Sequence, residues 1–127
     1  MANIRSFKDL IVWQRSMDAA VTLFFLMKKH FPKDEQFSLV DQIRRSSRSV
    51  PSNISEAWRK RRYPAAFTAK LNDSEGEAAE TQTHLEMAKR CGYLTAEQVA
   101  PLDREYEEIL AMLTEMAANP DKWTIRK

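Results

Sequence analysis

The sequence predicts an all-α fold, an antiparallel up-and-down four-helix bundle, and three observations support this prediction. The 127 residues include only two glycines, too few for the many tight turns of a β-sandwich or barrel. Good helix formers such as Ala, Glu, Lys, Leu and Met are frequent. Apolar residues recur at steps of three and four over four segments of roughly twenty residues, joined by short links. We expect one domain over residues 1–127, with 119–127 as a loose tail.

The first helix is expected from about Phe7 to His30. Ser6 and Asp9 have the spacing of a capping box at its start, and Pro32 ends it. The predicted inner face consists of Leu10, Trp13, Met17, Ala20, Phe24, Met27 and Phe31. Val12, Val21 and Phe25 add apolar surface outside this stripe. The helix is therefore expected to touch a second partner as well as its own bundle, which favours self-association.

The second helix is expected to begin near Asp34 and to stop before Pro64. Its predicted inner face consists of Phe37, Val40, Ile43, Ser47, Val50, Ile54 and Trp58. Pro51 lies within this pattern, removes one backbone donor and clashes with the carbonyl of Ser47. We therefore expect a kink there, with Asn53 and Glu56 capping the restarted helix.

The third helix is expected over Ala65 to Cys91. Its predicted inner face consists of Phe67, Leu71, Ser74, Ala78, Thr81, Leu85 and Ala88. Gly76 costs about 1 kcal/mol relative to Ala in mid-helix, so a close approach of another helix is expected there. Gly92 is well placed as the C-terminal cap.

The fourth helix begins after a second capping box, Thr95 with Gln98, and ends at Asn119-Pro120. Its predicted inner face consists of Val99, Leu102, Tyr106, Ile109, Leu113 and Met116. Beyond it, Trp123 and Ile125 are expected either to be loose or to dock on a neighbour.

Two classes of enzyme share the helical-bundle architecture, and each needs particular residues at a particular spacing. Di-iron bundles need two Glu-x-x-His pairs, but Met27 and Thr81 stand three residues before His30 and His84. Glutamate pairs three residues apart hold Mg²⁺ in all-α nucleotide pyrophosphohydrolases. Two such pairs occur here, Glu77 with Glu80 and Glu105 with Glu108. This spacing is also common on solvated helices, where the pairs form surface charge or salt bridges. We therefore expect no enzyme, no catalytic residues, no cofactor and no bound metal, and the nucleotide hydrolase stays the weakest alternative.

The cysteine content and the hydropathy favour a cytoplasmic protein. Cys91 is the only cysteine, so no internal disulfide is possible, and we expect it to be a small packing residue. The first ten residues are polar and lack the apolar core of a signal peptide. No stretch approaches the roughly 18 apolar residues of a membrane-spanning helix, so no membrane partner is expected.

The near-neutral net charge of +2 conceals a strongly basic segment. Between Gln42 and Arg62 the only acid is Glu56, and the basic residues are Arg44, Arg45, Arg48, Arg59, Lys60, Arg61 and Arg62. Four consecutive cations flanked by Trp58 and Tyr63 suit phosphate contacts with a base stacked on an aromatic ring. The alternative is a helix C-terminus whose cations stabilise the dipole and aid solubility, with Trp58 in the core or an interface.

Three sequence blocks together resemble a known family. They are Phe7-x-Asp9-Leu10-x-Val12-Trp13-Gln14, then Gln42 to Ser47 with Ser49-Val50-Pro51, Asn53-Ile54 and Glu56, then Asp73-x-Glu75-Gly76-Glu77-Ala78-x-Glu80-Thr81-Gln82 with Cys91-Gly92-Tyr93. They are similar to those of the four-helix bundle proteins encoded in intervening sequences of bacterial 23S rRNA genes. Accessory proteins of diversity-generating retroelements are also similar. The resemblance extends from Phe7 to about Met116.

The resemblance implies a bundle that assembles into a ring, typically a homopentamer. For the retroelement relatives it implies binding of nucleic acid and of a reverse transcriptase through basic surface. Four motif positions carry over, with structural roles in capping and subunit packing: Asn53, Glu56, Gly76 and Glu80. The leading hypothesis is a ring-forming bundle that binds nucleic acid, RNA rather than DNA. The alternative is a protein-interaction scaffold whose basic segment meets an acidic partner or its own acidic helices.

Overall fold

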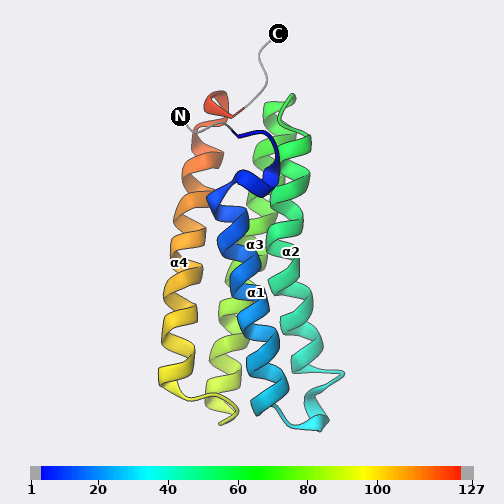
Figure 1. Cartoon of the computed structure of the whole chain (residues 1–127), viewed down its shortest axis with the longest axis vertical. Coiled ribbons are helices and arrows are strands. Elements are labelled where there is room, and N and C mark those ends of the chain that lie inside the picture. Colours follow the sequence, from blue (N-terminus) through cyan, green and yellow to red (C-terminus); the bar gives the residue numbers. More distant parts are fainter. Residues whose placement is uncertain (1–3, 124–127) are drawn as a thin grey trace.

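A computed structural model describes residues 4–123, which form four long helices running alternately down and up one axis (Figure 1). The helices are α1 (Ile11–His30), α2 (Leu39–Arg59), α3 (Pro64–Arg90) and α4 (Ala96–Ala118). Three short 3-10 helices flank them, η1 (Phe7–Asp9), η2 (Lys33–Glu35) and η3 (Pro120–Lys122). Each long helix packs on the next, and α4 packs back on α1. The predicted antiparallel up-and-down four-helix bundle is confirmed.

The inner faces of α3 and α4 match the sequence prediction residue for residue. All seven predicted positions on α3 are buried, and so are all six on α4. On α4 the outer side is charged, and on α3 the bulky residues Phe67, Leu71 and Leu85 all lie on one face, which enters the core. The capping box of Thr95 and Gln98 starts α4 as predicted.

The predicted inner face of α1 is wrong, because the helix is rotated about its own axis relative to the prediction and buries a neighbouring face. Its buried residues are Val12, Ser16, Ala19, Leu23 and Met27. From the predicted stripe only Leu10 and Met27 are buried, while Met17 is 38% exposed. Apolar residues cover most of the circumference of α1, so steps of three and four fit two neighbouring faces equally well. The helix also begins later than predicted, because Phe7–Asp9 forms the separate η1, which the Ser6–Asp9 capping box starts.

The start of α2 and the predicted restart of the helix after Pro51 also differ from the prediction. Residues 33–35 form η2 and α2 begins only at Leu39, so Phe37 precedes the helix and is 90% exposed. The helix continues through Pro51, so the predicted restart capped by Asn53 is wrong. Glu56 does not cap either: its carboxylate lies 3.0 Å from Lys70 Nζ on α3. The remaining stripe, from Ile43 to Trp58, is buried as predicted.

The two glycines have different environments. Gly92 has a φ of +80°, and its N–H donates to the carbonyl of Lys89, so it caps α3 as predicted. Gly76 is exposed, and a Cβ built there would meet no atom within 4 Å. The predicted close helix approach at Gly76 is therefore absent within the described chain.

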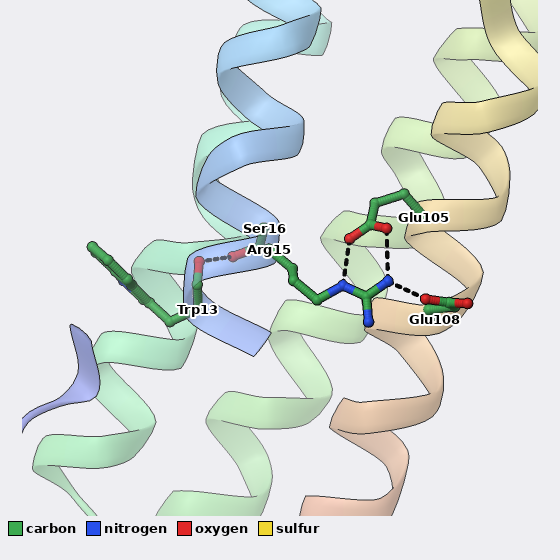
Figure 2. A network of polar contacts seen from close by, with 5 residues as sticks. All are labelled: Trp13, Arg15, Ser16, Glu105 and Glu108. Atoms are coloured by element: carbon green, nitrogen blue, oxygen red, sulfur yellow. Dashed lines mark hydrogen bonds and ion pairs between the residues drawn. The ribbon is translucent and has the colours of Figure 1, made fainter. Parts of the chain in front are cut away.

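Polar contacts join α1 to both of its neighbours, and Figure 2 shows those with α4. Arg15 donates two hydrogen bonds of 2.7 Å to Glu105 on α4, and its Nη2 also contacts Glu108. On the other side, Trp13 Nε1 donates to Ser55 Oγ of α2 over 3.0 Å. These contacts set the rotation of α1 where apolar patterning alone leaves two choices.

Two further observations concern the surface and the chain end. Among residues 4–123, no helix combines the length and hydrophobicity that crossing a lipid bilayer requires. Trp123 packs, partly buried, against the core, whereas Ile125 lies outside the described residues.

Candidate nucleic-acid interface

The seven basic residues singled out in the sequence fall into two groups in the structure. The helix cluster, Arg44, Arg45 and Arg48, lies on the first half of α2. The turn cluster, Arg59, Lys60, Arg61 and Arg62, lies where α2 ends and the chain turns into α3. At 1.5 Å per residue the groups are about 16 Å apart along the helix axis. They therefore do not form one compact patch.

A tight turn presents the cations of the turn cluster to solvent. The Lys60 N–H donates to the carbonyls of Glu56 and Ala57, and the Tyr63 N–H donates to the carbonyl of Lys60 over 2.9 Å. Pro64 at the first position of α3 stops any continuation of α2, because its ring fixes φ and supplies no donor. Arg59, Lys60 and Arg62 are consequently all exposed at one end of the bundle.

Trp58 belongs to the core and not to the surface. Its ring is only 7% exposed, and the Arg61 guanidinium covers it at 4.0 Å from the ring centroid. Arg61 also donates to the Trp58 carbonyl over 2.8 Å. Burial and the neighbouring Arg59 charge lower the pKa of Arg61. Of the two aromatic residues considered for base stacking, only Tyr63, at 62% exposure, is open to a ligand.

The two clusters differ from several other basic residues in their ion pairs within residues 4–123. None of the seven side chains forms a salt bridge there, whereas Arg15, Lys70, Lys89, Arg90 and Lys122 all do. Glu56, the single acid of the basic segment, is held by Lys70. Burial raises the pKa of Glu77 on α3, and the charge of Arg45 opposes that shift, so α3 partly compensates the helix cluster. The turn cluster keeps its positive field at its end of the bundle.

The helix cluster has a different neighbourhood from the turn cluster. Arg44 is half-buried at the edge of a cavity of about 360 Å³, and its Nε has no hydrogen-bond partner. Arg48 borders a second cavity, of about 340 Å³, together with Met17, Phe24 and Pro51. Phe24 lines both cavities, which are therefore neighbours between α1 and α2. Arg44 and Arg48 thus lie beside apolar surface, unlike the turn cluster.

The carboxylate pairs have structural surroundings. Glu105 and Glu108 both bind Arg15 of α1 (Figure 2). Burial, and then the charge of Glu80, raise the pKa of Glu77. Glu80 Oε1 lies 3.5 Å from His84 Nε2. In the described part of the chain, no three His, Cys, Asp or Glu side chains are grouped as metal ligands.

Cys91 does not have the role that the sequence suggested. It is exposed at the C-terminal end of α3, so its prediction as a small packing residue is wrong. Since the residue follows the last helical turn and precedes the Gly92 cap, its side chain lies outside the core face.

Comparison with known proteins connects this bundle with a family. The model of the 23S rRNA-intervening sequence protein family matches residues 8–115. A crystal structure from Bacteroides thetaiotaomicron, of a protein with unknown function from the S23 ribosomal protein family, is 33% identical in sequence. The match covers 84% of this chain and 98% of that one, with a TM-score of 0.76. No curated protein matches. With nearly all of the bundle matched, the chain belongs to the 23S rRNA-intervening sequence protein family.

Proposed function

We propose that this protein is an oligomeric, non-catalytic bundle that binds nucleic acid, RNA in preference to DNA, through the turn cluster. The carrying observation is that three of four consecutive cations, Arg59, Lys60 and Arg62, are exposed at one tight turn and form no salt bridge in the described chain. Unpaired surface cations attract phosphates and release condensed counterions when they bind them. No cofactor or metal enters this proposal.

The turn cluster suits single-stranded or looped RNA. Tyr63 is exposed directly beside the cations and offers a flat ring for an unpaired base. The turn cluster lies where α2 ends and not along a helix face, whereas a DNA major groove is filled by the length of a helix or by paired strands. The family name refers to 23S rRNA, which makes a structured ribosomal RNA fragment the first ligand to test.

Two features support assembly and location. The resemblance implies a homopentameric ring, and the exposed apolar side of α1 (Met17, Val21 and Phe25) agrees with a protein that self-associates. The lone thiol of Cys91 is exposed and suits a reducing compartment, so we propose a cytoplasmic location.

The test is fluorescence anisotropy of a labelled structured RNA at several salt concentrations. The variant replaces the three exposed cations of the turn by Gln, Arg59→Gln, Lys60→Gln and Arg62→Gln. It keeps Arg61, whose guanidinium covers Trp58. The matched control removes the same charge from three exposed lysines elsewhere, Lys8→Gln, Lys29→Gln and Lys33→Gln.

Each lost phosphate contact lowers the slope of log affinity against log salt by about 0.7 for a single strand. The triple turn variant should therefore lose about 2 units of slope. Between 50 and 200 mM salt, the wild type should weaken by about 20-fold more than the variant. Equal slopes in the turn variant and the control contradict the turn cluster as the binding surface. No binding even at low salt favours the protein-interaction scaffold, with a reverse transcriptase or another protein as the partner.

A further inference from the structure

We propose that the cavity of about 360 Å³ between α1 and α2 binds a small aromatic phosphomonoester. This cavity lies where α2 begins, whereas the turn cluster lies where α2 ends, at the opposite end of the bundle (Figure 1). The inference is therefore independent of the nucleic-acid binding proposed above, and the two ligands are separable by mutation.

The cavity is formed where the chain passes from α1 to α2. Its lining comes from the last two turns of α1, from the connection between the helices and from the first two turns of α2. Small-molecule sites have volumes of about 300–1,000 Å³, and this cavity is at the lower end of that range. It therefore suits a compact ligand, such as one ring with one charged group.

Apolar side chains make part of the lining suitable for a ring. Phe24 and Phe31 are half-buried aromatic residues in the wall, and Met27 and Val40 add aliphatic surface beside them. Aromatic rings prefer offset or edge-on contacts with one another, which stabilise a bound ring beyond the burial of its area. An aromatic body is thus the apolar part that this lining fits best.

Three cations from three elements line the same cavity, and in the described chain no acidic residue does. They are Lys28 on α1, Lys33 in η2 and Arg44 on α2. None of the three forms a salt bridge within residues 4–123. A phosphomonoester carries a charge of about −1.5 to −2 at neutral pH, whereas a carboxylate carries only one negative charge. Three unpaired cations therefore favour a phosphomonoester.

Two of these cations have contacts that suit a ligand with both a ring and a charge. Arg44 Nε is shielded from solvent and has no hydrogen-bond partner in the described chain. A shielded donor without a partner lowers stability, and a phosphate oxygen would supply the missing acceptor. Lys28 Nζ lies 5.2 Å from the centroid of the Phe24 ring, so its charge is already beside the aromatic lining.

The connection that forms one wall is anchored on two sides. The ring of Phe31 packs on that of Tyr93, with 5.3 Å between the centroids, and the Tyr93 hydroxyl donates to Glu35 over 2.7 Å. The same Glu35 carboxylate accepts from the N–H of Leu39 at the start of α2. A wall anchored in this way is ordered before a ligand arrives, so binding costs less conformational entropy.

Two other cavities lack this combination. The neighbouring cavity beside Arg48 contains that single cation. A cavity of about 480 Å³ between α1 and α4 is lined by the carboxylates of Asp9 and Glu115, which repel a phosphate. We therefore assign the ligand to the cavity with three cations.

The first experiment is isothermal titration calorimetry of the full chain with phenyl phosphate. Inorganic phosphate keeps the charge without the ring, phenol keeps the ring without the charge, and benzoate replaces the phosphate by a carboxylate. We expect phenyl phosphate to bind once per chain and at least about tenfold more tightly than each of the others, since each lacks contacts of one kind. No saturable binding of phenyl phosphate overturns the proposal. Equal binding of inorganic phosphate overturns the aromatic assignment, and equal binding of benzoate overturns the phosphate assignment.

The second experiment compares neighbouring charges on the same helices. Lys28→Gln and Arg44→Met should each weaken phenyl phosphate by about tenfold, the effect of one charge-assisted hydrogen bond. Lys29→Gln and Arg45→Met are the matched controls, because each removes the same charge from the next residue, which is exposed and does not line the cavity. The controls should bind like wild type. An equal loss in a variant and its control shows only general attraction to positive charge and overturns the assignment.

Urea unfolding without ligand checks the role of Arg44. Because its Nε has no partner to lose, Arg44→Met should unfold at the same urea concentration as wild type or a higher one. A clear fall in that concentration would show that Arg44 has a structural partner and overturn its assignment to the ligand. Lys28 is exposed, so Lys28→Gln tests the cavity without this concern.

The triple turn variant separates this inference from the proposed function. With Arg59, Lys60 and Arg62 replaced by Gln, phenyl phosphate should bind as in wild type, because the cavity is unchanged. A loss of phenyl phosphate binding in that variant places the ligand at the turn and overturns the inference. RNA binding that survives Lys28→Gln while phenyl phosphate binding is lost confirms that the two sites are separate.

Discussion

Arg15 is expected to hold α1 against α4, and replacing it should destabilise the bundle measurably. Its guanidinium binds Glu105 through two hydrogen bonds of 2.7 Å and also contacts Glu108 (Figure 2). Arg15→Met keeps the apolar stem of the side chain but removes the charge and all three contacts. It also leaves the two carboxylates close together without a cation between them.

The magnitude follows from the exposure of the partners. Hydrogen bonds to charged groups contribute about 1.5–3 kcal/mol when buried, and exposed ion pairs about 0–1 kcal/mol. The Arg15 and Glu105 side chains are 28% and 30% exposed, so we expect about 1.5 kcal/mol for this pair. Glu108 is 62% exposed. The loss of its contact with Arg15, together with the repulsion that then remains between the two carboxylates, adds about 0.5 kcal/mol. The total of about 2 kcal/mol should lower the melting temperature by about 6–8 °C.

Urea unfolding followed by circular dichroism measures this free energy. Arg104→Met is the control, because Arg104 is exposed on α4 and forms no salt bridge within residues 4–123. Its replacement should change stability by less than about 0.5 kcal/mol. A double-mutant cycle of Arg15→Met with Glu105→Gln should give a coupling energy of about 1 kcal/mol. If Arg15→Met and Arg104→Met lower the free energy of unfolding equally, the Arg15 contacts do not stabilise the bundle and this reasoning is refuted.

Two further predictions concern a glycine cap and a tyrosine–carboxylate pair. Gly92→Ala should destabilise the fold by about 1 kcal/mol, since φ is +80° at that residue. Gly76→Ala should not destabilise the monomer, because the position is helical and a Cβ meets no atom there. Denaturant unfolding compares the two variants. The Tyr93 hydroxyl donates to Glu35 over 2.7 Å, which lowers the pKa of Glu35 and raises the pKa of Tyr93 to about 12. The pair should therefore stabilise the fold between pH 4.5 and 10.0, lose its effect as pH falls through the lowered Glu35 pKa, and lose it again as pH rises towards 12. The difference in melting temperature between wild type and Tyr93→Phe should therefore be largest between these pH values and should shrink at both ends. A difference that does not change with pH would exclude the pair as its cause.

The bundle itself and two of its helix faces were predictable from the sequence. On α4 charged residues separate the apolar positions clearly, and on α3 the bulky residues Phe67, Leu71 and Leu85 share one face, so the buried face could be read from each helix. The caps at Thr95 and Gly92 were also predictable, because they depend on local geometry within a few residues.

The rotation of α1 was not predictable from its own residues. Val12, Ser16, Ala19 and Leu23 face the core, although the neighbouring stripe is more apolar. Contacts to other helices, from Arg15 to α4 and from Trp13 to α2, select this rotation. A pattern confined to one helix contains no information about such partners.

The candidate site shows the same division. Composition alone identified the seven basic residues, because charge is a property of the residues themselves. Their separation into a solvent-exposed turn cluster and a helix cluster beside apolar surface depends on where α2 ends and on which side of α1 faces it. The burial of Trp58 under Arg61 likewise follows from packing. The sequence determined the helices, their caps and their charges, since these arise from local propensity and composition. Only the tertiary structure decided which faces meet and which stay exposed, because that choice minimises the free energy of all four helices together.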